Sequence, residues 1–364
     1  MLYPYNLKSM HHAPDNHKIL AAVDEAINTY FENSVQNAAK IDASYSQLWE
    51  VTHGLINSGG KRLRPKITIL AYLAFGGTEW KKIVPVAAAQ EFLHFSLLIH
   101  DDIIDRDVIR YGNLNVIGKY KNIYSEFLPS PAEQTHFANS AALLAGDLML
   151  SASHQLIAES ELNEKKKLIA HQLLSKSIFE VAGGELLDTE SSFTPSTDCD
   201  ALKIARYKTA SYTFVTPMLT GAMLADAPNA QVSKLKDLAL ALGTAYQLVD
   251  DLIGIFGDKK VTGKSTNSDI LEGKKTFMVE QAVNAMSVVE KAKFDSLFGN
   301  HAATTEQIED IKSLLVATGA KAKTEQSIKI YADKAQACLA LLELDEHFHN
   351  EFAELITKVT ERAY

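Results

Sequence analysis

The sequence predicts an all-α protein folded as one large helical bundle. Runs rich in Ala, Leu, Lys and Glu recur at helical spacing along the 364 residues, and strand-like alternation is weak throughout. Two segments, 81–105 and 236–256, are apolar on nearly every face, which is typical of helices at the centre of a bundle. Because 46% of the residues are hydrophobic, the chain can fill a large core.

The expected helices follow the periodic segments and end at residues that break helices. Gly59 and Gly60 end one helix, and Pro65 suits the first turn of the next. Loops are predicted at 127–134 and 192–200, which are rich in proline and serine. The predicted helices cover 15–37, 42–58, 65–76, 81–108, 136–159, 162–190, 199–225, 231–257, 268–285, 287–299, 305–317, 320–341 and 344–362.

Neither a linker nor a repeat divides the chain, so we predict a single domain over 1–364 with a flexible extension at 1–14. The net charge of −9 argues against a nucleic-acid partner. Cys199 and Cys338 lack metal-ligand spacing, and we interpret them as reduced thiols of a cytoplasmic protein. We expect no signal peptide. We also expect no membrane span, since no charge-free apolar run reaches ~18 residues.

Two acidic clusters interrupt the apolar helices. LLIHDDIID carries Asp101, Asp102 and Asp105, and the later QLVDDLIGI carries Asp250 and Asp251. Both clusters fall near helix C-termini, where the helix dipole disfavours negative charge. Ionised carboxylates beside a core need a positive partner, which makes a merely solvated helix end the weaker alternative. Hard oxygen ligands suit Mg²⁺, which completes its shell with water and phosphate oxygens, so two acidic walls could hold a diphosphate.

Separate basic and polar residues could complete a phosphate site. The turn GGKRLRP places Lys61 and Arg64 at the start of a helix, where anions are favoured. His94 lies two helical turns before Asp101 on the same face. Singly, each has an ordinary explanation as a basic surface loop or a core histidine. The further candidates, from YKTA and GKSTNSDILEGKKT, are Lys208, Thr209, Lys264, Asp269, Lys274 and Lys275.

With these motifs in order, the chain resembles the trans-type isoprenyl diphosphate synthases, or polyprenyl synthetases, over nearly its whole length. The motifs that carry the resemblance are GGKRLRP, HDDIID, GDLML, GGELLD, YKTA, YQLVDD and DILEGKKT. The resemblance implies an isoprenoid synthase fold with a central active-site cavity, usually in a homodimer. It implies a Mg-dependent prenyltransferase that condenses isopentenyl diphosphate with an allylic diphosphate to an all-trans product.

The resemblance also implies roles for individual residues. Six carboxylates would hold about three Mg²⁺ ions, and these are Asp101, Asp102, Asp105, Asp250, Asp251 and Asp269. The cations expected at the allylic diphosphate are Arg110, Lys208 and Lys264, and those expected at isopentenyl diphosphate are Lys61, Arg64 and His94. Two residues, Thr209 and Gln247, would face the forming allylic cation, and Lys274 matches a further family lysine.

Three positions depart from the family pattern. Tyr111 replaces the second of two adjacent arginines, Gly254 removes the third acid of the second motif, and Glu185 stands where glutamine is common. They raise the alternative of a weakly active or regulatory subunit of a heteromeric synthase. A terpene cyclase would share the acidic motif but would not need a second set of diphosphate ligands. A non-enzymatic scaffold would leave the buried charge unexplained.

Two residues about one turn before Asp101, Ser96 and Leu97, are expected to line the path of the prenyl tail. In the family that the chain resembles, an aromatic residue here stops growth at short products. Since Ser96 is small, we predict a product longer than farnesyl, with geranylgeranyl as the minimum.

Overall fold

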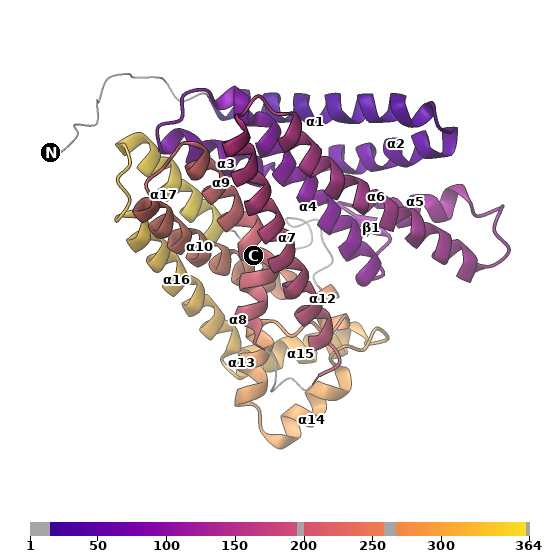
Figure 1. Cartoon of the computed structure of the whole chain (residues 1–364). Helices are drawn as coiled ribbons and strands as arrows, with labels where there is room; N and C mark the ends of the chain where they lie inside the picture. Colours follow the sequence, from indigo (N-terminus) through magenta and orange to yellow (C-terminus); the bar gives the residue numbers. More distant parts are fainter. Residues whose placement is uncertain (1–14, 195–199, 258–266, 362–364) are drawn as a thin grey trace.

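The computed structural model describes residues 15–194, 200–257 and 267–361, which form the predicted helical bundle (Figure 1). The predicted extension at 1–14 lies outside the described residues. The N-terminal elements are α1 (Asn16–Ala39), α2 (Ala43–Asn57), α3 (Leu63–Ala74), the 3₁₀ turn η1 (Trp80–Ile83), α4 (Val84–Ile104), β1 (Ile109–Arg110), β2 (Asn113–Leu114), α5 (Val116–Ile123), α6 (Pro131–Glu159) and α7 (Glu164–Ser191).

The second half continues the bundle. Its elements are α8 (Ala201–Ile204), the π-helix η3 (Ala205–Val215), α9 (Thr216–Leu224), α10 (Asn229–Phe256), α12 (Ser268–Leu271), α13 (Phe277–Ala285), α14 (Val288–Leu297), α15 (Thr305–Ala317), α16 (Ala320–Leu339) and α17 (Glu346–Thr360). In Figure 1 the indigo pair α1 and α2 and the orange helices α13–α15 lie at opposite ends of the molecule.

The core forms where the two most apolar helices pack against their neighbours. Helix α4 lies against α6, and α10 lies against α16 and η3, while α3 packs on α9. Phe31, Phe92 and Phe95 fill the N-terminal part of the core, and Phe214 and Phe352 fill the part around α10. Burial on both sides explains why α4 and α10 show no polar face in the sequence.

Most predicted helices are confirmed, but α5 was not predicted, and three further stretches differ locally. The predicted loop at 127–134 ends earlier, because Ser130 caps α6 by accepting a hydrogen bond from the amide of Glu133 and Pro131 starts the helix. The predicted helix 199–225 contains the π-helix η3. The predicted helix 268–285 is broken at Gly273, which has a φ of 69°.

The sequence did not predict the hairpin of β1 and β2. Its antiparallel strands pair Ile109 with Leu114 and Arg110 with Asn113. The turn residues Tyr111 and Gly112 both have positive φ, at 53° and 76°. A two-residue turn of this kind is usually recognised by Asn-Gly or Asp-Gly, so Tyr-Gly gave no clear signal. The hairpin brings Arg110 back toward the end of α4.

Among the described residues, three helices are long and apolar enough to cross a membrane by length and composition alone, and they lie within Trp80–Ile104, Pro131–Glu159 and Asn229–Phe256. Inside the bundle, 72%, 50% and 67% of their most apolar windows are buried. Packing within the protein therefore accounts for most of this apolar surface, and the absence of a span stays a prediction.

Candidate active site

The first acidic cluster stands at the C-terminal end of α4. Asp101 and Asp105 are half-buried and face the same side, whereas the carboxylate of Asp102 is buried. Arg110, carried by the hairpin, donates from Nε to Asp102 Oδ1 at 2.8 Å and from Nη2 to Asp101 Oδ2 at 3.3 Å. Burial raises the pKa of Asp102 to about 6 in spite of Arg110. Within the described part of the chain, the other oxygen, Oδ2, is buried without a hydrogen-bond partner, so the cluster is short of positive charge there.

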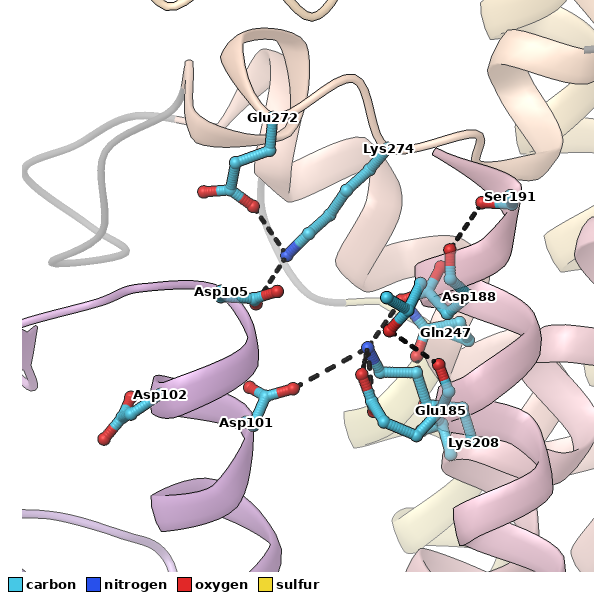
Figure 2. A network of polar contacts seen from close by, with 12 residues as sticks. Asp101, Asp102, Asp105, Glu185, Asp188, Ser191, Lys208, Gln247, Glu272 and Lys274 are labelled. Carbon is cyan, nitrogen blue, oxygen red and sulfur yellow. Dashed lines mark hydrogen bonds and ion pairs between the residues drawn. The ribbon is translucent and has the colours of Figure 1, made fainter. Parts of the chain in front are cut away.

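The second group of charges joins α7 to η3. Lys208 lies with its Nζ 2.5 Å from Asp188 Oδ2, 3.1 Å from Glu185 and 3.7 Å from Asp101 Oδ1, as Figure 2 shows. Gly184 allows this approach, because a Cβ there would collide with the backbone of Lys208. Burial raises the pKa of Glu185 to about 7, although Lys208 opposes the shift. The three carboxylates raise the pKa of Lys208, so it stays charged.

The second acidic motif lies on α10 and is held by polar neighbours. Asp250 is half-buried, and Asp251 is buried and accepts a 2.7 Å hydrogen bond from Gln247 Nε2. Thr209 on η3 donates at 2.5 Å to Gln247 Oε1. Burial, helped by Asp269 and Asp250, raises the pKa of Asp251 well above its usual range. The predicted pair Thr209 and Gln247 is therefore in direct contact, beside the second acidic motif.

The turn between α12 and α13 closes the site on the side of α4. Lys274 lies with its Nζ 3.3 Å from Asp105 Oδ2 and 2.9 Å from Glu272 Oε2 (Figure 2). The nearby carboxylates raise its pKa despite burial, so this ammonium is charged. Lys275 points the other way and donates to the carbonyls of Ser191 and Thr194.

A cavity of about 920 Å³ lies between these elements. Its lining includes Asp105, Glu185, Asp188 and Lys274, so acids from α4 and α7 share one space with a lysine from the turn. This volume is within the range of ligand pockets. The cavity therefore offers space for a charged ligand beside Asp105 and Lys274, while Asp101, Lys208 and Asp250 are not in its lining.

The three cations of the basic turn before α3 differ in their contacts. Arg62 is buried and bound to Asp24 at 2.8 Å and Glu91 at 3.4 Å, so it holds α1, α3 and α4 together. Lys61 is exposed. Arg64 donates from Nη2 to Thr213 Oγ1 at 2.7 Å, and its buried Nε has no hydrogen-bond partner among the described residues. A guanidinium N–H left over in this way could bind an anion.

Other predicted residues are placed as follows. Ser96 is buried, with 1% of its surface exposed, and Leu97 is half-buried on the face that carries Asp101. Lys264 lies outside the described residues. Sequence reasoning missed Tyr212 and Thr213, which contact Arg64; their place four and five residues after Lys208, near YKTA, was the available signal.

Mg²⁺ fits the chemistry of this site. Every predicted donor is a carboxylate oxygen, the hard ligand that Mg²⁺ takes, and Asp102 offers a buried oxygen that has no partner among the residues described. In the described part of the chain, no three His, Cys, Asp or Glu side chains lie close enough to hold a metal by themselves. Because Mg²⁺ keeps waters and takes substrate phosphate oxygens, carboxylates on separate walls are compatible with it.

Comparison with known proteins agrees with this arrangement. The family model for polyprenyl synthetase matches residues 46–315. The chain is similar to geranylgeranyl diphosphate synthase of Sulfolobus acidocaldarius, at 33% identity over 77% of this chain and 82% of the relative. It is also similar to geranylfarnesyl diphosphate synthase of Aeropyrum pernix, at 31% identity over 79% of this chain and 85% of the relative.

A solved structure resembles the whole fold. The crystal structure of geranylgeranyl pyrophosphate synthase from Corynebacterium glutamicum, complexed with isoprenyl diphosphate and magnesium, superposes with a TM-score of 0.89 at 28% identity. The match covers 96% of this chain and all of the other. The fold is thus that of an all-α isoprenoid synthase. The chain belongs to the polyprenyl synthetase family of trans-isoprenyl diphosphate synthases and is an enzyme that acts as a prenyltransferase.

Proposed function

We propose that this enzyme condenses isopentenyl diphosphate with an allylic diphosphate to form an all-trans prenyl diphosphate of geranylgeranyl length or longer. The proposal is carried by two neighbouring groups of charged residues that suit two diphosphates. Acids with Lys208 and Lys274 form one, and Arg64 with His94 forms the other. A reaction that joins two diphosphate esters needs both. The names of the relatives from Sulfolobus and Aeropyrum support the product range.

The acidic clusters are proposed to hold the allylic diphosphate through Mg²⁺. The metal ligands would be Asp101, Asp102, Asp105, Asp250, Asp251 and Asp269, with about three ions in all. When bound, Mg²⁺ supplies positive charge that stabilises the departing diphosphate. Lys208 and Lys274 add fixed positive charge from the opposite side of the cavity. Lys264 and Arg110 are proposed to join them at the diphosphate.

Residues beside the second motif then face the carbon that loses the diphosphate. The hydrogen-bonded oxygens of Thr209 and Gln247 present partial negative charge to an allylic cation. Arg64, His94 and Lys61 orient isopentenyl diphosphate so that its double bond attacks this cation. Loss of a proton then gives the elongated product, and the released diphosphate is the proposed acceptor. The apolar walls of α4 and α10 limit access of water that would quench the cation.

A homodimer is the proposed assembly. Helices α6 and α7 expose large apolar side chains that the single chain leaves in contact with solvent, and these are Phe137, Leu143, Leu144, Leu168, Phe179 and Leu186. Exposed apolar patches commonly mark protein interfaces. We also propose a cytoplasmic enzyme without a membrane span, because the apolar windows of α4 and α10 are mostly buried inside the bundle.

Product analysis tests the proposal and separates it from its alternatives. The purified chain is incubated with Mg²⁺, farnesyl diphosphate and labelled isopentenyl diphosphate. A labelled prenyl diphosphate longer than farnesyl is expected. A cyclic hydrocarbon without incorporation of label would indicate a terpene cyclase, and product only after addition of a second subunit would indicate the heteromeric alternative.

A further inference from the structure

Tyr212, on the π-helix η3, contacts two residues of the proposed isopentenyl diphosphate site, the buried Arg64 and the half-buried His94. The guanidinium carbon of Arg64 lies 4.4 Å from the centre of the Tyr212 ring. The hydroxyl of Tyr212 lies 3.5 Å from Nδ1 of His94, and the two rings are 5.9 Å apart at 36°. The next residue, Thr213, accepts a hydrogen bond from Arg64 at 2.7 Å. One short stretch of η3 thus supports two anion ligands from α3 and α4.

Contacts with Tyr212 and Thr213 hold Arg64 in place, but they do not use all of its N–H donors. Only 8% of its surface is exposed, and among the described residues its Nε has no hydrogen-bond partner. A buried guanidinium normally satisfies its donors. The flat ring of Tyr212 supports the cation without using any N–H, because the attraction is to the face of the ring. Among the described residues, the Nε–H of Arg64 therefore stays available for an anion.

His94 is supported in a complementary way. Burial, together with Arg64, Arg110 and Arg62, lowers the pKa of His94 well below its ordinary value, so the imidazole is neutral. A neutral imidazole has one accepting and one donating nitrogen. When the Tyr212 hydroxyl donates to Nδ1, the proton resides on Nε2, which can then donate to a phosphate oxygen.

The position of Tyr212 also relates this site to the allylic site. Lys208 and Thr209 lie on the same π-helix, four residues before Tyr212 and Thr213. Bonding in a π-helix runs from i to i+5, and such segments occur frequently at functional sites. Adjacent turns of η3 therefore contact residues of both proposed diphosphate sites.

We propose that Tyr212 is a positioning residue for isopentenyl diphosphate, which orients Arg64 through its ring and selects the donating tautomer of His94 through its hydroxyl. This inference rests on the proposed function. In this role Tyr212 supports binding of isopentenyl diphosphate and takes no part in ionisation of the allylic diphosphate.

Steady-state kinetics of three variants test it. Tyr212→Leu removes ring and hydroxyl and should raise the KM for isopentenyl diphosphate about tenfold, in line with a buried cation–π contact. The KM for farnesyl diphosphate and kcat should stay within about twofold, since binding alone is affected. Tyr212→Phe keeps the ring and should recover most of the loss. Tyr207→Leu is the matched control. Tyr207 lies on the same π-helix, and the centre of its ring is 5.5 Å from the guanidinium carbon of Arg206. This variant should leave both KM values unchanged.

Two further measurements separate positioning from general damage. In an Arg64→Ala background, Tyr212→Leu should have a clearly smaller effect on this KM, because the contact with Arg64 is already lost; fully additive effects would overturn the proposal. The ¹⁵N chemical shifts of His94 should report a proton on Nε2 in the unmutated chain and a mixture of tautomers in Tyr212→Phe. Unchanged kinetics in an active enzyme would also overturn it, whereas an unmutated enzyme that forms no elongated product would contradict the proposed function instead.

Discussion

The carboxylate of Asp269 occupies the space above Gly254, so that a Cβ built on Gly254 would collide with Oδ2 of Asp269. The second acidic motif lacks its third acid at this position of α10. An acid from α12 lies over the same turn of the helix instead. A carboxylate from another segment thus lies where the motif lacks its third acid.

Gly254→Ala should weaken Mg²⁺ binding without destabilising the helix. The added methyl displaces Asp269, while alanine itself favours a helix by about 1 kcal/mol over glycine. We expect the Mg²⁺ concentration for half-maximal activity to rise several-fold. Gly183→Ala on α7 is the control, because a Cβ there meets nothing within 4 Å. Equal Mg²⁺ requirements in both variants would contradict the role given to Asp269.

Glu185→Gln should stabilise the metal-free enzyme at alkaline pH. The pKa of Glu185 rises from 4.5 to about 7 on folding. Between these pH values the folded chain therefore keeps a proton on Glu185 that the unfolded chain has lost. Its contribution to the free energy of unfolding is complete below pH 4.5 and is lost as the pH rises through about 7. At pH 8 the variant should be more stable by on the order of 1–3 kcal/mol, and the difference should shrink toward pH 5.

Urea unfolding in EDTA at pH 5 and pH 8 measures this difference. Glu190→Gln, an exposed change on the same helix, should leave the free energy of unfolding unchanged at both values. A stability gain for Glu185→Gln that is the same at pH 5 and pH 8 would show that titration of Glu185 is not its cause.

Tyr111→Arg should strengthen binding of isopentenyl diphosphate. Tyr111 is 42% exposed at the tip of the hairpin, and its ring lies over Gly59, which begins the basic turn. An arginine here would add a cation beside Lys61, so the KM for isopentenyl diphosphate should fall by roughly three- to tenfold. Tyr111→Phe keeps the ring without adding charge and should leave this KM near its original value. A higher KM in Tyr111→Arg would show that packing on Gly59 matters more than charge.

Ser96→Phe should shorten the product. The side chain is almost fully buried one turn before Asp101, so an aromatic ring must take space from its surroundings. We expect farnesyl or geranylgeranyl diphosphate to replace longer products on thin-layer analysis. Ser96→Ala should retain the original product lengths, and the thermal midpoint of each variant identifies simple unfolding. An unchanged ladder from folded Ser96→Phe would exclude position 96 from the path of the prenyl tail.

The helical core could be predicted from the sequence because a helix that is buried on all sides has apolar residues on nearly every face. The segments that became α4 and α10 are apolar on every face, and both lie at the centre of the bundle. The acidic clusters were equally visible, since carboxylates beside Leu and Ile require compensation. The motif order then indicated the family, which the comparisons confirmed.

Contacts between distant segments could not be predicted, because they depend on packing and not on local pattern. Nothing in the sequence places Lys274 against Asp105, or Asp269 over Gly254. The hairpin brings Arg110 back to Asp102 and depends on a positive φ at Tyr111. Tyrosine rarely adopts this conformation, so the sequence does not predict it. Arg62 and Arg64 look alike in the sequence, yet in the described part of the chain Nε of Arg64 lacks a hydrogen-bond partner, whereas Nε of Arg62 bonds to Asp24.

Turnover of Asp101→Ala tests the central claim most directly. Asp101 faces Lys208 across the site, and its loss removes a proposed metal ligand from the wall of α4. With saturating Mg²⁺, farnesyl diphosphate and isopentenyl diphosphate, kcat should fall by at least about a hundredfold. Asp333→Ala, an exposed change on α16, should retain full activity. Activity of folded Asp101→Ala within about threefold of the unmutated enzyme would contradict metal-assisted diphosphate release at this cluster.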